Sequence, residues 1–327
     1  MTTLAPLEEP RRKLRARVLL AGKFCVSLLL FGYLGSLMRG PALAAAFGRA
    51  TAPHFALAVA FGLCSLSVGA ARWGSLLMAY GAPKRLPFAR LLRLYFIGFF
   101  YNFLPGAVGG DVIRGVATRE SFGARGSTAA IAVVFVERVL GLTALLFITA
   151  TMALLRPAQG VQSVLPWSMA GLALSGGAVL TISLAHRVAP RLPGFAGRFA
   201  ARLPAIAAPR PFALALLLSF GTQALVALAA HAILVEIAPQ VTLADSLALV
   251  PLASAAAFFP LTPGGAGARE GAFVWLFTAI GVAREDALAA SLLVLGANLV
   301  LAVIGGVVQL RTPRPAAPAE SSSESNG

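Results

Sequence analysis

The sequence predicts an all-α polytopic membrane protein built from two inverted repeats, and three observations support this prediction. The 327 residues are 58% hydrophobic and only 12% charged, with a mean hydropathy of +0.83, which is too apolar for a water-soluble domain. Six apolar segments are long enough to span a bilayer. Two further apolar segments are each interrupted near the middle by prolines and glycines.

Each predicted span is an apolar run of about 20 residues, the length that crosses the hydrocarbon core. The runs cover about 18–38, 53–71, 128–155, 164–186, 212–237 and 286–310. The interrupted segments, about 88–123 and 246–281, are each long enough for two half-helices that dip into the membrane and return. If each instead crosses as a pair of spans, the number of spans rises to eight to ten.

The predicted spans divide into two matching halves, about 18–155 and 164–310. Each half has the order span, span, interrupted hairpin, span. Because three crossings per half is an odd number, the second half is inverted in the membrane relative to the first. The two hairpins then enter from opposite faces, and their glycine-rich tips meet near the midplane, as in transporters with inverted repeats.

The basic residues gather on one side of this predicted topology. Twenty arginines and lysines fall on the side of the N-terminus, including Arg72 in the loop after the second span, and four fall on the other side: Arg39, Arg49, Arg156 and Arg284. This excess predicts that both termini are cytoplasmic. Residues 1–17 form a basic N-terminus, 18–310 form one transmembrane domain, and the tail 311–327 is predicted to be disordered.

Composition and motifs argue against several other classes of protein. A net charge of +15 would suit nucleic-acid binding, but basic clusters between apolar spans are typical of membrane topology and of attraction to anionic lipids, so no nucleic-acid partner is expected. Cys25 and Cys64 lie in predicted spans without ligand spacing, and the three histidines are scattered, so no metal or cofactor is predicted. No P-loop and no nucleophile motif occurs, so no catalytic residue is assigned.

The first interruption, Tyr101–Arg114, combines chain-breaking residues with charge. Proline lacks an N–H and ends a half-helix, and glycines let the backbone turn tightly and approach a ligand. A half-helix that starts after the glycines directs its free N–H groups and positive dipole end at the tip, where an arginine adds a full charge. The candidate binding or gating residues here are Asn102, Pro105, Gly106, Gly109, Gly110, Asp111 and Arg114.

The second interruption, Phe258–Glu270, repeats these features in the same order. Its candidate residues are Pro263, Gly264, Gly265, Gly267, Arg269 and Glu270. Positive groups at membrane depth suit an anion, and a lipid phosphate is the anion that a bilayer offers. The alternative is that the glycines only permit close helix packing and the charges pair internally.

A third polar element, Glu137–Arg138, lies within the predicted span 128–155. Neighbouring helical residues point about 100° apart, so each needs a partner on another helix. The expected partners are Arg114 or Arg269 for the acid and Asp111 or Glu270 for the base. The six residues would form a balanced network of three acids and three bases. It is a static lock, a proton relay or a site whose pairing changes with ligand, and we favour the last of these.

Taken together and in this order, the motifs resemble the flippase-like transmembrane domain of lysylphosphatidylglycerol synthases. The resemblance covers about 15–310. It rests on three motifs, which are Asn102–Gly106 with Gly109–Asp111 and Arg114, then Glu137–Arg138, and then Pro263–Gly265 with Gly267 and Arg269–Gly271. It implies a bacterial inner-membrane protein that moves, or helps to move, a lipid between leaflets. The soluble aminoacyl-transferase domain of bifunctional members is missing here, so lysine transfer is not expected. Ala107 occupies a position that is often basic in related sequences.

We therefore expect an inner-membrane lipid translocase for a lipid with an anionic headgroup. A glycerophospholipid, a polyprenyl-linked sugar and a hopanoid-type lipid are all candidates. The expected partners are membrane lipids, with a lipid-biosynthetic enzyme as the candidate protein partner. Two alternatives remain open: a lipid-modifying enzyme that uses Asp111, Glu137 or Glu270 as acid or base, and a scaffold subunit of an envelope-lipid assembly.

The charge distribution generates a test of topology. Reporter fusions after Arg125, Arg210 and Arg311 are expected to report the cytoplasm, and fusions near Gly160 and Pro239 the opposite side, because arginine-rich loops are retained in the cytoplasm. The measurement is paired phosphatase and fluorescence activity of each fusion. A cytoplasmic signal at Gly160 would contradict the topology.

Overall fold

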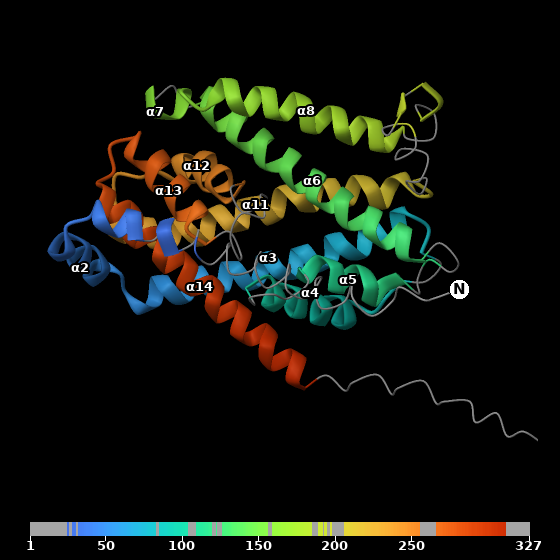
Figure 1. The fold of residues 1–327 in the computed structure, drawn as a ribbon, viewed down its shortest axis with the longest axis horizontal. Helices are drawn as coiled ribbons and strands as arrows, with labels where there is room; N and C mark the ends of the chain where they lie inside the picture. The colour runs from blue at the N-terminus through green and yellow to red at the C-terminus, as the bar shows by residue number, and fades with distance from the viewer. Residues whose placement is uncertain are drawn as a thin grey trace, which may run out of the picture.

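The computed structural model describes residues 32–82, 85–103, 109–119, 126–155, 159–184, 206–255 and 266–311, with a few short stretches between them. Regular structure in these residues is entirely helical (Figure 1). Five helices are long and apolar enough to cross a membrane, which makes the chain a multi-pass membrane protein. They are α3 (Ala52–Ala79), α6 (Gly126–Leu155), α8 (Leu165–Ser183), α11 (Pro209–Ile237) and α14 (Arg284–Leu310).

These five helices confirm five of the six predicted spans. About half of the predicted first span, 18–38, lies outside the described residues. Helices α3, α8 and α11 each have a proline at the first or second helical position, where its missing N–H leaves no hydrogen bond unmade. Helix α14 instead begins with Glu285 and Asp286 in its first turn, where negative charge is stabilised by the helix dipole.

Helix α3 is longer than the sequence indicates. The predicted span ends at residue 71, whereas the helix continues to Ala79, so Arg72 lies inside α3 and not in a loop. The side chain of Arg72 is buried, with 9% of its surface exposed. A charge can occupy this position because it is paired within the bundle, as described below.

A short helix, α2 (Gly40–Arg49), precedes α3 and was not predicted. Its last residue, Arg49, forms an ion pair with Asp286 at the start of α14. Just before α2, the backbone N–H of Arg39 donates to Oε1 of Glu285 at 3.3 Å. These contacts attach the connection before α3 to the beginning of the last span.

Both interrupted segments contain two short helices. The first has α4 (Phe88–Phe103) and α5 (Gly110–Thr118), and the second has α12 (Leu243–Ala255) and α13 (Ala268–Thr278). The residues between them, 104–108 and 256–265, lie outside the described residues. Helix α5 runs back along α4, because Gly110 contacts Gly98 and Arg114 reaches Tyr95 further back along α4.

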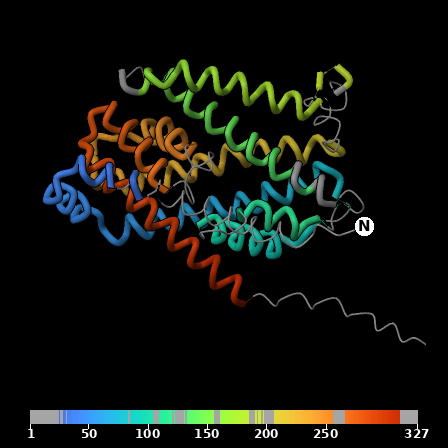
Figure 2. Tube along the Cα trace, viewed as in Figure 1, coloured from blue at the N-terminus to red at the C-terminus, as the bar shows by residue number. Residues whose placement is uncertain are grey.

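An antiparallel pair, α3 and α11, forms the centre of the bundle (Figure 2). At one end Oε2 of Glu236 accepts a hydrogen bond from the N–H of Thr51 at 2.7 Å. At the other end the carbonyl oxygen of Ala79 accepts one from the N–H of Ala207 at 2.8 Å. Helices α4, α6, α12 and α14 contact one or both of these two helices, whereas α8 packs on α6.

The contacts of the first half have counterparts in the second. Helix α4 packs on α14, and α12 packs correspondingly on α6. Within the halves, α5 contacts α4 and α6, while α13 contacts α12 and α14. In Figure 1 the hairpin of α4 and α5 lies toward the right of the bundle, and α12 and α13 lie toward the left.

The helix connections therefore fall at two ends. The end of α3, the start of α4, the end of α5 and the start of α11 lie at one end, which we call the basic end because Arg85, Arg90, Arg119 and Arg210 are there. The starts of α3, α12 and α14 lie at the other end. Which end faces the cytoplasm stays a prediction of the charge count.

Two glycines allow the helices to cross closely. A methyl group on Gly110 would lie 1.7 Å from the carbonyl oxygen of Gly98, and one on Gly305 would lie 2.2 Å from that of Phe96. These backbone atoms cannot move aside without displacing α4. The position of α4, and of the residues it carries, thus depends on the two glycines.

This packing generates a stability prediction. Gly110→Ala and Gly305→Ala are each expected to destabilise the protein by about 1–3 kcal/mol or more, because overpacking forces the helices apart. The measurement is the thermal unfolding midpoint of purified protein in detergent. Gly176→Ala and Gly177→Ala in α8 are matched controls, since a methyl group there meets no atom within 4 Å. Equal stability of all four variants would refute the close crossing.

Candidate functional site

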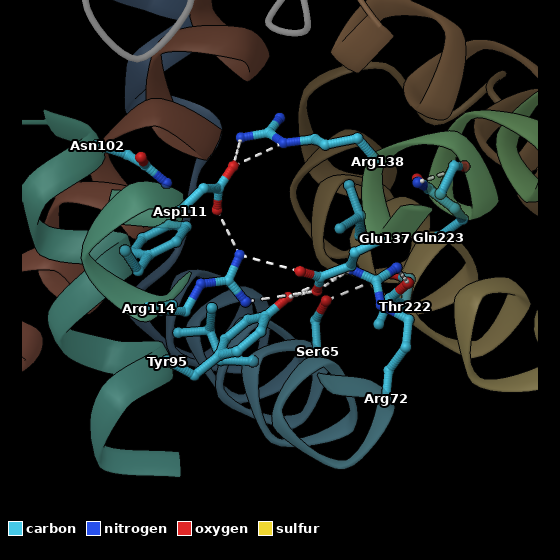
Figure 3. A pocket seen from close by; sticks show the side chains of 14 residues that line it. Ser65, Arg72, Tyr95, Asn102, Asp111, Arg114, Glu137, Arg138, Thr222 and Gln223 are labelled. Atoms are coloured by element: carbon cyan, nitrogen blue, oxygen red, sulfur yellow. Dashed lines mark hydrogen bonds and ion pairs between the residues drawn. The ribbon is translucent and has the colours of Figure 1, made fainter. Parts of the chain in front are cut away.

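A cavity of about 220 Å³ lies between α3, α4, α5, α6 and α11 (Figure 3). Glu137 on α6 is about 16 Å along the helix axis from its start, so the cavity lies well inside the bundle. Its lining is rich in charged and polar side chains, which are Ser65, Arg72, Tyr95, Asn102, Asp111, Arg114, Glu137, Arg138, Thr222 and Gln223.

The carboxylate of Glu137 is the centre of the site. Its Oε1 accepts hydrogen bonds from Nη2 of Arg72 at 2.8 Å and from the hydroxyl of Tyr95 at 3.0 Å. Its Oε2 lies 3.1 Å from Nη2 of Arg114. Only 3% of the surface of Glu137 is exposed, so water does not solvate its carboxylate. The three partners supply the hydrogen bonds and charges that water would otherwise provide.

Arg114 connects this carboxylate to a second one. Its guanidinium forms an ion pair with Asp111, which lies one turn earlier on α5. The same guanidinium lies 4.2 Å from the ring centroid of Tyr95 and 5.0 Å from that of Trp73. Cation–π contacts with two rings and ion pairs with two acids fix the orientation of this arginine.

Arg138 completes the chain of charges. Its Nε donates to Oδ2 of Asp111 at 2.7 Å, and its Nη2 contacts the same oxygen. Among the charged side chains of this site it is the most exposed, with 45% of its side-chain surface accessible. In Figure 3 it approaches Asp111 from the side opposite Arg114.

Arg72 is held from both halves of the chain. Besides Glu137, it donates to the hydroxyls of Thr222 at 3.3 Å and Ser219 at 3.4 Å, both on α11. Its Nε has no hydrogen-bond partner among the described residues. This arginine therefore joins the central pair of helices to α6 and keeps one donor uncommitted.

The charges of the site do not balance. Among the described side chains of the cavity, three arginines face two carboxylates, which leaves one net positive charge. The predicted network of six residues is different in two respects. Arg72 belongs to the cluster, and Arg269 pairs with its neighbour Glu270 at 2.6 Å instead of with Glu137. A net positive cavity attracts an anion more strongly than a balanced network would.

The structure describes only part of the first interruption, Tyr101–Arg114. Oδ1 of Asn102 accepts the N–H of Gly110 at 2.8 Å, which links α4 to the first residue of α5 across the interruption. Gly109 precedes α5 and is exposed, and Gly110 is buried at the crossing with α4. Pro105 and Gly106 lie outside the described residues.

The second motif places its charges at the start of α13. Gly267 precedes this helix with φ of +89°, a conformation that favours glycine, and its N–H donates to Oε2 of Glu270 at 2.6 Å. Glu270 is fully buried and also accepts from Arg269. Pro263, Gly264 and Gly265 lie outside the described residues.

The residues of the site that were not predicted include Arg72, Trp73 and Tyr95, together with Ser65, Thr222 and Gln223 of the cavity lining. The signal for the first was present, because the apolar sequence continues from Trp73 to Ala79 after Arg72. If a predicted span may contain one arginine, the span that begins near residue 53 extends through Arg72 to Ala79. Tyr95 carried no such signal, since an aromatic residue on an apolar helix face is more often a packing residue.

The polar cavity adjoins an apolar one. A second cavity, of about 80 Å³, lies between α3, α4, α11 and α14. The two cavities share Ser65, Leu66, Phe99 and Val226 in their linings. Small residues such as Gly62 and the alanines 58, 229 and 297 line the rest of it. A cavity with a cationic lining thus lies beside a smaller cavity with a mostly apolar lining.

The arginines give the cavity side chains of the kind that bind anions. Arginine presents a planar, permanently charged fork that matches phosphate and carboxylate oxygens. Among the described residues, no group of three or more His, Cys, Asp or Glu side chains is arranged to hold a metal ion. Asp111 and Glu137 are both engaged by arginines, which favours their ionised forms and their role as partners of the cations.

The position of Glu137 generates a prediction of coupling. Arg72→Gln and Glu137→Gln are each expected to destabilise the protein by about 3–5 kcal/mol, because each leaves a buried charge without its partner. The double variant is expected to cost less than the sum of the two by about 1–3 kcal/mol. The measurement is thermal or denaturant unfolding in detergent.

Tyr95→Phe is the matched control for this cycle. It removes the hydroxyl that donates to Glu137 but keeps the ring against Arg114, so a loss of about 1 kcal/mol is expected. Strictly additive effects of Arg72→Gln and Glu137→Gln would show that the two side chains are not coupled.

The sequence matches a known protein family. The sequence profile of the lysylphosphatidylglycerol synthase TM region matches residues 19–306, which includes α2 and nearly all of α14 together with every helix between them. No curated protein shows a significant match to the sequence. Because the match covers most of the chain and all the described cavity residues, the chain belongs to the family of the lysylphosphatidylglycerol synthase transmembrane region.

Proposed function

We propose that this protein is a translocase that moves a lipid with an anionic headgroup between the leaflets of the bacterial inner membrane. The observation that carries the proposal is a cavity whose described side chains bear one net positive charge, beside a smaller and mostly apolar cavity that shares part of its wall. A lipid has the same two parts, a charged headgroup and an apolar chain. Membership of a family of membrane-lipid proteins supports the same conclusion.

The headgroup would bind by competing with the two carboxylates for the arginines. Asp111 is shared by Arg114 and Arg138, and Glu137 is shared by Arg72 and Arg114. Each acid therefore keeps an arginine partner when a phosphate takes over another. This sharing lowers the cost of exchanging partners, because no charge is left unpaired during the exchange.

The architecture that we propose for translocation has two inverted repeats with re-entrant hairpins. Support comes from the helix contacts, because the contacts that α3 to α6 make correspond to the contacts that α11 to α14 make. It also comes from the positions of the hairpins, since α4 begins and α5 ends at the basic end, whereas α12 begins and α13 ends at the other. In this proposal the basic end is cytoplasmic, as are both termini.

The proposal generates a test by lipid transport. Arg114→Lys keeps a positive charge but loses the planar fork that binds two oxygens at once. We expect folded protein in which the rate of lipid movement falls about tenfold or more. Arg269→Lys is expected to reduce the rate too, because this proposal places Arg269 at the second tip. The measurement is the appearance of a fluorescent anionic phospholipid in the opposite leaflet of proteoliposomes, repeated with zwitterionic and polyprenyl-linked lipids.

Arg90→Lys is the matched control for this assay, because Arg90 is exposed on the same hairpin and does not line the cavity. Full transport by Arg114→Lys at normal expression would contradict recognition of an anion by this arginine. Chemical alteration of the lipid during the assay would favour the lipid-modifying enzyme. Absence of both movement and alteration for every lipid class would favour the scaffold.

A further inference from the structure

A third cavity, of about 500 Å³, lies at the basic end of the bundle. It is formed by the last turns of α3, the start of α4 and the start of α11. It shares no lining residue with the two cavities described above. We call it the basic-end groove.

The charge of the basic-end groove has one sign. Among the described residues that line it, Arg85, which precedes α4, and Arg210, in the first turn of α11, are the only charged ones. Both are exposed, and neither has an ion pair with a described residue. The two guanidinium groups come from opposite halves of the chain.

The rest of the lining is almost entirely apolar. Met78 and Leu91 form the inner wall, and Phe88 and Leu214 lie at the surface with 50% and 46% of their area exposed. In a protein that spans a membrane, exposed apolar side chains face acyl chains. The groove thus combines two cations with a surface suited to hydrocarbon.

The two sides of the groove are held together by the backbone. The carbonyl oxygen of Ala79, at the end of α3, accepts hydrogen bonds from the N–H groups of Ala207 and Ala208 at 2.8 and 3.2 Å. The rings of Tyr80 and Phe212 pack edge to face beside this junction. Arg210 is consequently fixed close to the end of α3.

We propose that the basic-end groove binds a phospholipid with an anionic headgroup, taken from the adjacent leaflet and separate from the lipid in the central cavity. The phosphate contacts Arg85 and Arg210, and an acyl chain lies along Phe88 and Leu214. Basic pockets between spans are a recognised way to hold anionic lipids. Because the lipid contacts both halves of the chain, its binding stabilises their association.

Native mass spectrometry of detergent-purified protein tests this proposal. The protein is titrated with phosphatidylglycerol or phosphatidylcholine, and bound lipids are counted. We expect phosphatidylglycerol to be retained in preference to phosphatidylcholine and to raise the thermal unfolding midpoint. The double variant Arg85→Gln/Arg210→Gln is expected to bind phosphatidylglycerol about tenfold more weakly, because two charge-assisted contacts are lost.

Arg90→Gln/Arg93→Gln is the matched control. It removes the same charge from exposed arginines of α4 that do not line the groove, so it is expected to retain the lipid. Leu214→Trp narrows the groove without changing charge and is expected to weaken binding as well. Equal loss in the control pair would show general attraction to a basic surface, and equal binding by all variants would show that no lipid occupies the groove; either result overturns the proposal.

The central cavity is tested separately in the same experiment. Arg114→Lys leaves the basic-end groove intact, so preferential binding of one phosphatidylglycerol is expected to persist in that variant. Failure of transport with retention of this lipid would contradict only the translocase. Transport without selective lipid binding at the groove would contradict only the present proposal.

Discussion

The buried carboxylate of Glu137 is the constraint on which the rest of the site depends. Its two oxygens receive Arg72 from α3, Tyr95 from α4 and Arg114 from α5, so one side chain of α6 joins three other helices. A charge in a medium of low polarity is tolerated only with such partners. The four helices must therefore pack in one register for the carboxylate to be buried, and the same register creates the cavity beside it.

The hairpin of α4 and α5 delivers two of those partners, and its geometry follows from residues that carry no charge. Gly98 and Gly110 let the two helices touch through their backbones, and Gly305 lets α4 lie against α14. The side-chain amide of Asn102 then joins the hairpin across its interruption. Close backbone packing by small residues is how membrane helices associate without a hydrophobic driving force. Here it also fixes where Tyr95 and Arg114 point.

Arginines line two cavities of the bundle, one in its interior and one at the basic end. The central cavity holds its arginines among acids and aromatic rings, which suits a headgroup that binds and leaves. The groove at the basic end has two exposed arginines and no acid among its described lining residues, which suits a lipid that stays. Both spaces combine cations with apolar surface, because the solvent around this protein is itself lipid.

The sequence by itself determined the membrane class, five spans to within a few residues at most ends, the two interrupted segments and the two motifs. These features are local, since hydropathy, proline and glycine act on the residues next to them. Only the tertiary structure decided the partners. Arg72, which follows the apolar run that hydropathy recognises, lies inside α3 beside Glu137, while Arg269 is taken up by Glu270. Such pairings depend on the rotation and register of helices far apart in sequence, which local composition does not contain.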